Sequence, residues 1–268
     1  MKPILSVTTM MLLGARLWCI GAEVGDAPFA NGRWLDLTHS FSSNTIYWPT
    51  AQPFVLETEF HAHTEKGYFY AANRFSASEH GGTHVDAPIH FAEGRKTLDQ
   101  LSIEQLIGAA VVVDVSTKAA TNADYQVTVA DIEAWESRLG RIPVGAIVLF
   151  NTGFARHWPD ARKYLGTAER GAEAVAKLHF PGLHPEAAQW LAQNRSVRAV
   201  GIDTASIDFG QSTHFQSHVA LFEKNIPALE NVANLDQLPE AGFVVLALPM
   251  KIRGGSGGPV RIVGVLNP

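Results

Sequence analysis

The sequence predicts an α/β protein built on a mixed β-sheet with flanking helices. Short, mostly apolar runs rich in β-branched residues recur along the chain, and such runs are typical of strands covered on both faces. Segments with helix-capping patterns lie between some of these runs, and interleaved strands and helices define the α/β class. The length of 268 residues allows a core that needs no disulfide or metal for its stability. We expect residues 23–268 to form a single domain.

The apolar runs identify the expected strands, and capping patterns identify the helices. The clearest strand, residues 109–115, reads Ala-Ala-Val-Val-Val-Asp-Val. The full set comprises residues 34–37, 68–75, 109–115, 146–150, 197–202, 243–248 and 260–265. Helices are expected near 103–107, from a capping pattern at 128–131 to about 139, and over 185–194. The last begins with proline, which the first turn of a helix tolerates.

The composition excludes several functional classes. Hydrophobic residues make up 46% of the chain and charged residues 18%, as in ordinary soluble domains. A formal net charge of -5 gives no electrostatic footprint for nucleic acid. The single cysteine, Cys19, excludes an internal disulfide framework and a cysteine-based zinc site. After the N-terminal segment, no stretch approaches the ~20 apolar residues that span a bilayer. We therefore expect neither nucleic acid nor membrane among the partners.

The N-terminal residues 1–22 have the pattern of a secretory signal peptide. Lys2 gives a positive start, residues 3–13 carry no charge, and the segment ends in Gly-Ala. Arg16 interrupts the apolar run, so a mis-assigned start codon or a short tail remains the alternative. The pattern predicts a periplasmic or secreted protein, and its alternative predicts a cytoplasmic one.

Residues 80–90 carry the densest chemistry in the chain, His-Gly-Gly-Thr-His-Val-Asp-Ala-Pro-Ile-His. The paired glycines disfavour a helix. On a strand, His84 and Asp86 would point to one face, and the glycine bend can return His80 to the same point. Two imidazoles and a carboxylate are a natural set of ligands for zinc or manganese. The alternative is a group of ordinary hydrogen-bonded side chains.

His90 is the candidate catalytic residue. Pro88 ends regular strand pairing, which leaves His90 free to face the same cavity. A metal would lower the pKa of bound water toward neutrality, and a proton must then reach the departing nitrogen. Imidazole titrates near neutral pH and suits that transfer.

The motif resembles the H-x-G-T-H-x-D-x-P-x-H signature of the cyclase family of metal-dependent hydrolases, which includes bacterial kynurenine formamidases and isatin hydrolases. The resemblance extends from about Trp34 to Val265. It implies a swivelling β/α/β fold. It also implies that His90 is the proton donor and acceptor beside the metal ligands His80, His84 and Asp86.

His218 and Glu230 complete the site implied by the resemblance. They are twelve residues apart and Asn231 follows, a spacing that is similar to the formamidases. The resemblance implies that both face the metal centre, as ligands of a second metal or as contacts for substrate or proton relay. The alternative is a surface histidine and a glutamate beside a helix.

The number of metals follows from a departure from the formamidase pattern. Formamidases often carry adjacent histidines where Val219 follows His218 here. Residues 203–211 and 249–259 are more similar to the isatin hydrolases, which are associated with a single manganese. We therefore expect one divalent metal per chain, with Mn²⁺ preferred over Zn²⁺. The glycine-rich residues 254–258 lack the G-K-[ST] ending of a phosphate loop and are expected to form a mobile loop or tight connection.

The expected reaction is hydrolysis of a small cyclic aryl amide, isatin to isatinate. Tyr47, Trp48 and Phe75 are candidate stacking partners for a flat aryl substrate. N-formylkynurenine deformylation is the alternative within the same chemistry. A lyase or cyclase, and a non-catalytic exported domain that binds a metal or ligand, are the others, although a proton shuttle at His90 favours catalysis. A homo-oligomer, most simply a dimer, is expected.

Overall fold

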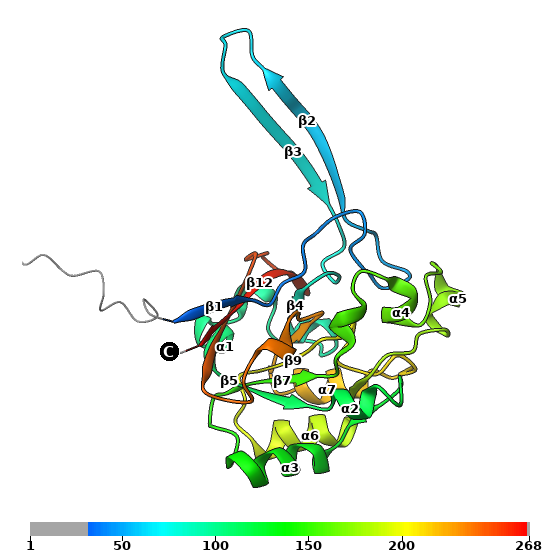
Figure 1. Ribbon diagram of the computed structural model, residues 1–268, viewed down its shortest axis with the longest axis vertical. Helices are drawn as coiled ribbons and strands as arrows, with labels where there is room; N and C mark the ends of the chain where they lie inside the picture. Colours follow the sequence, from blue (N-terminus) through cyan, green and yellow to red (C-terminus); the bar gives the residue numbers. More distant parts are fainter. Residues whose placement is uncertain (1–31, 267–268) are drawn as a thin grey trace, which may run out of the picture.

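An eight-stranded sheet that closes into a barrel forms the body of the protein (Figure 1), whose computed structural model describes residues 32–266. The strand order is β1-β12-β11-β5-β7-β9-β10-β4, and a further pairing of β12 with β4 closes the ring. The strands are β1 (Arg33–Asp36), β4 (His84–Asp86), β5 (Ile107–Asp114), β7 (Ile147–Asn151), β9 (Ala199–Ile202), β10 (Ala228–Glu230), β11 (Phe243–Pro249) and β12 (Gly257–Leu266).

The sheet is mixed, and its longest strand closes it. Strands β5, β7, β9 and β10 run parallel, and the remaining pairs are antiparallel. Along one edge, β12 pairs with β4 through Gly257, Gly258 and Pro259, and further along the same edge it pairs with β1. One long strand thus joins the two ends of the sheet, and the metal-motif strand β4 becomes part of the barrel wall.

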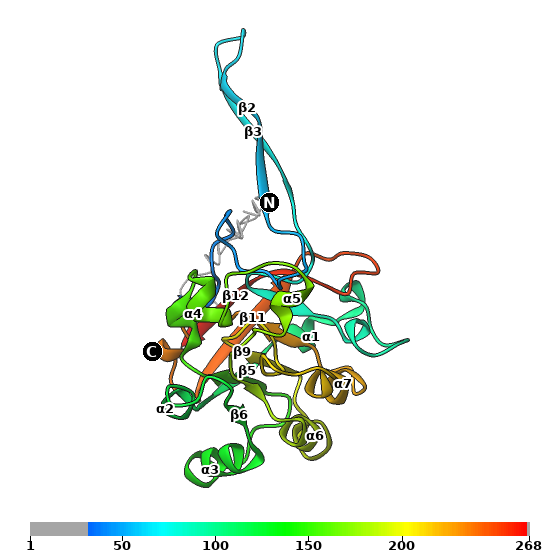
Figure 2. The same ribbon diagram turned by 90° about the vertical axis from the view of Figure 1, so that its right-hand side faces the viewer.

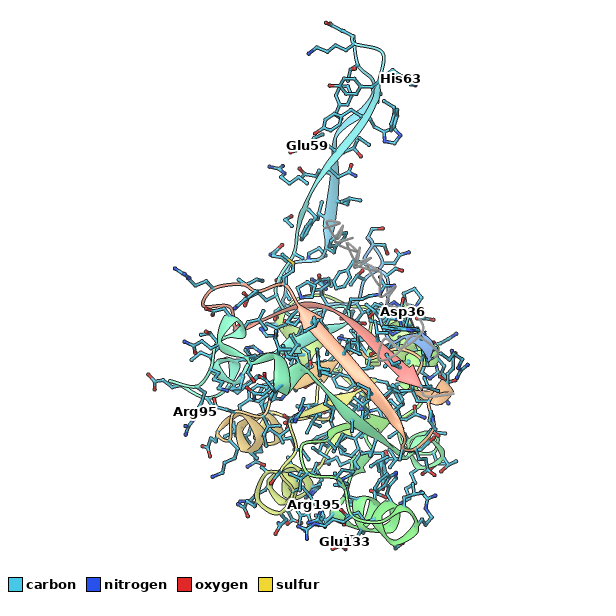
Figure 3. All side chains as sticks on the ribbon, turned by 90° about the vertical axis from the view of Figure 1, so that its left-hand side faces the viewer. Asp36, Glu59, His63, Arg95, Glu133 and Arg195 are labelled. Atoms are coloured by element: carbon cyan, nitrogen blue, oxygen red, sulfur yellow. The ribbon has the colours of Figure 1, made fainter. Side chains whose placement is uncertain are left out.

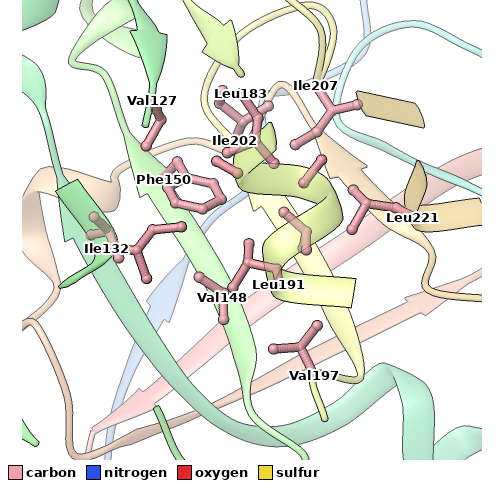
Figure 4. Close-up of a cluster of buried hydrophobic side chains, with 14 of the residues drawn as sticks. Val127, Ile132, Val148, Phe150, Leu183, Leu191, Val197, Ile202, Ile207 and Leu221 are labelled. Carbon is pink, nitrogen blue, oxygen red and sulfur yellow. The ribbon is translucent and has the colours of Figure 1, made fainter. Parts of the chain in front are cut away.

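Alternating side chains of the barrel strands form two hydrophobic cores. Val112 and Leu149 belong to the cluster inside the barrel, whereas Val111 and Phe150 belong to the cluster on its outside. The outer cluster is covered by α3 (Val129–Leu139), α6 (Pro185–Asn194) and α7 (Gln216–Phe222), and Figure 4 shows its packing around Phe150. Because successive side chains of a strand point to opposite faces, each of these buried strands contributes to both hydrophobic clusters.

Shorter elements connect these layers. Helix α3 begins at Thr128, whose hydroxyl accepts the Asp131 amide while the Asp131 carboxylate accepts the Thr128 amide at 2.7 Å. The remaining elements are α1 (Ile103–Leu106), α2 (Ser116–Ala119), α4 (Ala161–Leu165), α5 (Ala172–Val175), β6 (Gln126–Val127), β8 (Gly182–Leu183), and the 3-10 turns η2 (Pro88–His90), η3 (Leu98–Gln100), η4 (Phe154–His157) and η5 (Leu235–Gln237).

A long hairpin, hereafter the arm, stands away from the barrel (Figures 1 and 2). It consists of β2 (Val55–His63) and β3 (Phe69–Ser76), paired antiparallel with one irregularity between Thr58 and Phe60. None of its strand residues is buried. Side chains project from both of its faces, and Figure 3 labels Glu59 and His63 on it.

The predicted class, a mixed α/β sheet with helices packed on it, is confirmed. The expected run 68–75 does form a strand, but it belongs to the arm and not to the sheet. The glycine-rich segment corrects another expectation, because Gly257 and Gly258 lie in β12 and pair with β4. Residues 1–22, the predicted leader, lie outside the described residues. Between residues 32 and 266, no helix has both the length and the apolar character to cross a membrane.

Candidate metal centre

Three parts of the fold bring five titratable side chains together. His80 lies before β4, His84 and Asp86 on β4, His218 on α7, and Glu230 on β10. Antiparallel pairing sets Glu230 opposite His84, so their side chains share one face of the barrel wall. Val85 points into the barrel core, and its neighbours on β4 therefore point outward, toward α7.

The five side chains form two triads that share Asp86. In the first triad, Asp86 Oδ1 lies 2.7 Å from His80 Nδ1 and 3.0 Å from His84 Nε2. In the second, His218 Nε2 lies 3.2 Å from Asp86 Oδ2 and 3.0 Å from Glu230 Oε1. The candidate ligand atoms within each triad all lie within 4.8 Å of one another. Each set is compact enough for one ion, and Asp86 belongs to both.

His84 shows that a divalent metal fits this cluster. Its Nδ1 lies 3.0 Å from the carbonyl of Gly82, and donation to this carbonyl leaves the lone pair on Nε2. That Nε2 is buried without a regular hydrogen bond. It faces the carboxylates of Asp86, at 3.0 Å, and Glu230, at 3.4 Å. A nitrogen lone pair beside two carboxylates is the donor set that zinc and manganese take.

The charges of the cluster favour a cation. Burial disfavours the charged form of Asp86, but His80 and His84 outweigh it and hold the pKa of Asp86 well below its usual value. Burial also lowers the pKa of His84, yet Asp86 and Glu230 raise it to about 9. Burial and the charge of Asp86 raise the pKa of Glu230. A proton on His84 offsets the charge of the carboxylates in the metal-free protein, and a divalent ion would displace it.

Sequence reasoning missed the side chains that hold the ligands in place. Asp208 Oδ2 lies 2.6 Å from His218 Nδ1 and turns Nε2 toward the cluster. The Ser256 hydroxyl lies 2.9 Å from His80 Nε2 and donates to Glu79 at 2.6 Å. Carboxylate and hydroxyl partners of this kind fix the tautomer of a ligand histidine. The only sequence signal for Ser256 was its place among glycines. Glycine is needed next to Ser256 because β12 lies close to the His80 ring there.

Replacing Ser256 by Ala should weaken metal binding by about 10–100-fold, the usual effect of losing a partner behind a ligand histidine. The hydroxyl that orients His80 would be lost, while the backbone pairing of β12 remains. A metal titration followed by calorimetry measures the effect. Ser137→Ala is the matched control, because the Ser137 hydroxyl bonds only within α3. Equal affinities in the two variants would contradict the orienting role of Ser256.

A cavity of about 330 Å³ opens on the cluster and is walled largely by aromatic and apolar side chains. Of the three predicted aromatic contacts, Tyr47 and Trp48 line it. Tyr47 is buried and packs so closely on Gly81 that a Cβ there would lie 2.1 Å from its ring. Phe75 does not line this cavity and stacks on Phe54, with centroids 5.8 Å apart, at the root of the arm. A contact of Phe75 with substrate stays a prediction.

The cavity gains further aromatic walls that the sequence did not reveal. Phe91 and Phe215 both line it, and their ring centroids lie 4.9 Å apart. Phe91 directly follows the motif, and Phe215 has a left-handed backbone (φ 48°) just before α7. Neither position carries a pattern that marks a pocket in the sequence, because only the packing of α7 against the motif brings them together.

His90 lies in the cavity wall beside the first triad. Its ring stacks on His80, with centroids 3.8 Å apart and planes 14° apart. Among residues 32–266, no side chain hydrogen-bonds the His90 ring. Burial lowers the pKa of His90 to about 4 even though Asp86 opposes the shift. The ring is therefore uncharged at neutral pH and can contact a molecule bound in the cavity.

The fold and the site define a class of protein: a closed α/β barrel with a histidine–carboxylate cluster that could hold a metal, on which an aromatic cavity opens. The sequence pattern of the Cyclase family matches residues 35–209, and the chain belongs to this family. The family predicted from the motif is thereby confirmed.

Solved structures and characterised relatives agree with this assignment. Isatin hydrolase of Roseibium aggregatum is 31% identical over 265 residues, which cover 95% of each chain. The structure of isatin hydrolase A from Ralstonia solanacearum matches with a TM-score of 0.80 and 37% identity, over 88% of this chain and 93% of that one. Kynurenine formamidase of Bacillus cereus is 27% identical over 231 residues, 86% of this chain and 96% of its own.

Proposed function

We propose that this protein is a hydrolase of amide C–N bonds that opens the ring of isatin to give isatinate. The observation that carries the proposal is the joining of a buried metal-ligand cluster to an aromatic cavity of about 330 Å³. Flat apolar walls with few polar groups suit a small aryl amide. The similarity to isatin hydrolases over nearly the whole chain supports the same substrate.

The reaction adds water across one amide bond. The C–N bond between the ring nitrogen and the neighbouring carbonyl carbon breaks, the carbon receives the water oxygen as a carboxylate, the nitrogen receives one proton of the water, and the other proton is released to solvent. A divalent metal, when bound, polarises the carbonyl and lowers the pKa of water. His80, His84 and Asp86 would hold this metal, and His218 and Glu230 would face it from the other side.

His90 would move the proton. Its neutral ring accepts a proton as the carbonyl carbon is attacked, and the low pKa of His90, about 4, makes the resulting imidazolium a ready donor to the departing nitrogen. Trp48, Phe91 and Phe215 would hold the aryl ring by their flat faces. Stacking of this kind orients the substrate without adding polar groups that the amide would have to displace.

The assay that tests this function compares isatin with N-formylkynurenine on the purified protein loaded with Mn²⁺ or Zn²⁺. We expect kcat/KM for isatin to exceed that for N-formylkynurenine by at least about tenfold, or ~1.4 kcal/mol of transition-state binding. The reverse order would establish the formamidase alternative, which the kynurenine formamidase relatives favour. Binding of either compound without turnover would leave only a ligand-binding domain.

Metal content is the next prediction. We expect one tightly held ion per chain, with Mn²⁺ giving more activity than Zn²⁺, because Asp86 belongs to both triads and Val219 stands where formamidases often carry a second histidine. Elemental analysis of active protein after removal of loose metal measures the ratio. Two ions per chain in the active form would overturn the single-metal proposal and assign the second ion to His218 and Glu230.

Two further proposals concern the location of the protein and its oligomeric state. We propose that residues 1–22 direct the protein to the periplasm and are removed, so that the mature chain begins near Glu23. Intact-mass measurement of protein from the periplasmic fraction tests this, and an uncleaved cytoplasmic product would refute it. We propose that the enzyme acts as a homo-oligomer, most simply a dimer.

A further inference from the structure

The backbone of Phe215 is unusual for a bulky residue. Its φ of 48° lies in the left-handed region, which a large side chain rarely adopts. Between residues 32 and 266, the other non-glycine residues with this conformation are asparagines, whose short polar side chains tolerate it. Such a conformation persists only where surrounding groups hold it, and it is common at ligand clamps. The contacts that hold Phe215 therefore bear on the cavity that its ring lines.

Two hydrogen bonds hold the Phe215 backbone. Its amide donates to the Ser212 hydroxyl at 3.2 Å, and its carbonyl accepts the Val219 amide of α7 at 3.0 Å. The Ser212 hydroxyl in turn donates to Asp208 Oδ1 at 3.2 Å. The Asp208 carboxylate is buried and also accepts two backbone amides of α7, each at 3.1 Å. Ser212 therefore ties the left-handed residue to an acceptor that is itself fixed.

The left-handed backbone sets the direction of the Phe215 ring. The centroid of this ring lies 4.9 Å from that of Phe91 and 6.1 Å from that of Trp48. All three rings line the cavity, although they come from distant parts of the chain. A change of φ at Phe215 to an ordinary negative value would turn its Cα–Cβ bond and take the ring out of this wall. The shape of the aromatic wall thus depends on one backbone angle.

We propose that Ser212 is a positioning residue for the substrate: its hydroxyl holds Phe215 in the left-handed conformation that sets the ring against the aryl part of a bound amide. Ser212 does not line the cavity itself, so it acts through Phe215. The inference rests on the proposed function and deepens it, because it names the contact that gives the site its selectivity for an amide fused to an aryl ring.

The metal centre does not depend on the Ser212 hydroxyl. Ser212 belongs to neither triad. Asp208 holds His218 Nδ1 through its other oxygen, Oδ2, at 2.6 Å, and Oδ1 still accepts the Ser217 amide at 3.1 Å when the Ser212 hydroxyl is absent. Loss of this hydroxyl should therefore weaken the grip on the aryl ring and leave the metal and the hydrolysis of the amide itself unaffected.

Two compounds measure this grip in the full chain loaded with Mn²⁺: isatin, and pyrrolidine-2,3-dione, which has the same ketone and cyclic amide but no aryl ring. The measured quantity is the ratio of kcat/KM for isatin to kcat/KM for the ring-free compound. We expect Ser212→Ala to lower this ratio by about tenfold, the usual effect of losing one hydrogen bond, and Phe215→Ala to lower it at least as much. Ser212→Thr keeps the hydroxyl and should keep the ratio of the parent.

Ser137→Ala is the matched control, because the Ser137 hydroxyl bonds only within α3, and it should leave the ratio unchanged. Metal affinity, measured by calorimetry, should match the parent in all of these variants. A ratio that Ser212→Ala leaves unchanged would overturn the proposal. So would an equal loss of kcat/KM for both compounds, which is the result expected of general structural damage, or a loss of metal from Ser212→Ala.

Binding of indole separates this inference from the proposed reaction, because indole has the fused rings but no amide to hydrolyse. We expect its dissociation constant, measured by calorimetry, to rise about tenfold in Ser212→Ala and to stay at the parent value in Ser212→Thr. If the parent fails to hydrolyse isatin, the proposed reaction is refuted and the indole result alone decides the role of Ser212. A parent that does not bind indole, or equal affinities in the parent and Ser212→Ala, would overturn that role.

Discussion

Replacing Asp86 by Asn should remove nearly all bound metal and lower kcat/KM by several orders of magnitude. Asp86 is the residue that both triads share, and its two oxygens face different partners, His80 and His84 on one side and His218 on the other. Asn keeps the shape but loses the negative charge that draws a cation to the cluster. A bound metal would lower the pKa of water from ~15.7 to ~7. Without this effect, only a small residual rate of hydrolysis should remain.

Asp203→Asn is the matched control for this experiment. Asp203 is as fully buried as Asp86, but burial raises the pKa of Asp203 and its carboxyl serves mainly Thr152, whose hydroxyl donates to it at 2.6 Å. Asparagine can accept the same bond, so this variant should keep its metal. Elemental analysis of both variants gives the comparison. Full metal occupancy in Asp86→Asn would refute the assignment of the whole centre.

Replacing His90 by Ala should lower kcat by about 10²–10⁴-fold, the usual contribution of a positioned general acid–base group. The metal should remain, because the His90 ring stacks on His80 and belongs to neither triad. KM should change little, since an interaction used mainly in the transition state appears in kcat. Loss of metal in this variant would make His90 a ligand and leave His218 as the next candidate for proton transfer.

His90→Phe separates proton transfer from packing. Phenylalanine can maintain the stack on His80 but cannot carry a proton. If His90 acts as the proton shuttle, the Phe variant should be as slow as the Ala variant, whereas recovery of the rate in Phe would assign His90 a packing role. The pH dependence gives a second check. The kcat of the parent should fall with decreasing pH through a limb that reports protonation of His90, whose pKa is lowered to about 4 without metal, and neither variant should show that limb.

The part of the site that comes from the motif at residues 80–90 could be predicted from the sequence, because its geometry depends on residues that are close together in the chain. Two glycines exclude a helix at residues 80–83, and period-two alternation then sets His84 and Asp86 on one face of a strand whose middle residue, Val85, enters the core. The structure places both side chains in one triad with His80. Mostly apolar runs rich in β-branched residues predicted most barrel strands, and capping chemistry at Thr128 and Pro185 predicted α3 and α6.

The other half of the site depended on contacts between distant segments. Glu230 lies on the three-residue strand β10, too short for a periodic signal, and only pairing with β4 and β9 places it opposite His84. The family spacing pointed to His218, but nothing local indicated that Asp208 would orient it. Phe75, the third predicted aromatic contact, stacks on Phe54 at the root of the arm and does not line the cavity.

Closure of the barrel and projection of the arm were also decided by tertiary structure. β12 pairs with both β4 and β1 along one edge. The sequence of a strand does not indicate which other strands it will pair with. The run that forms β3 was predicted as a strand and β2 was not, and the placement of both outside the sheet depends on their pairing only with each other. The sequence by itself determined the ligand motif, most strand runs and the helix caps, because these depend on neighbours within a few residues. The shared cluster, the cavity and the arm required the fold, because their energies come from contacts between residues up to 177 positions apart.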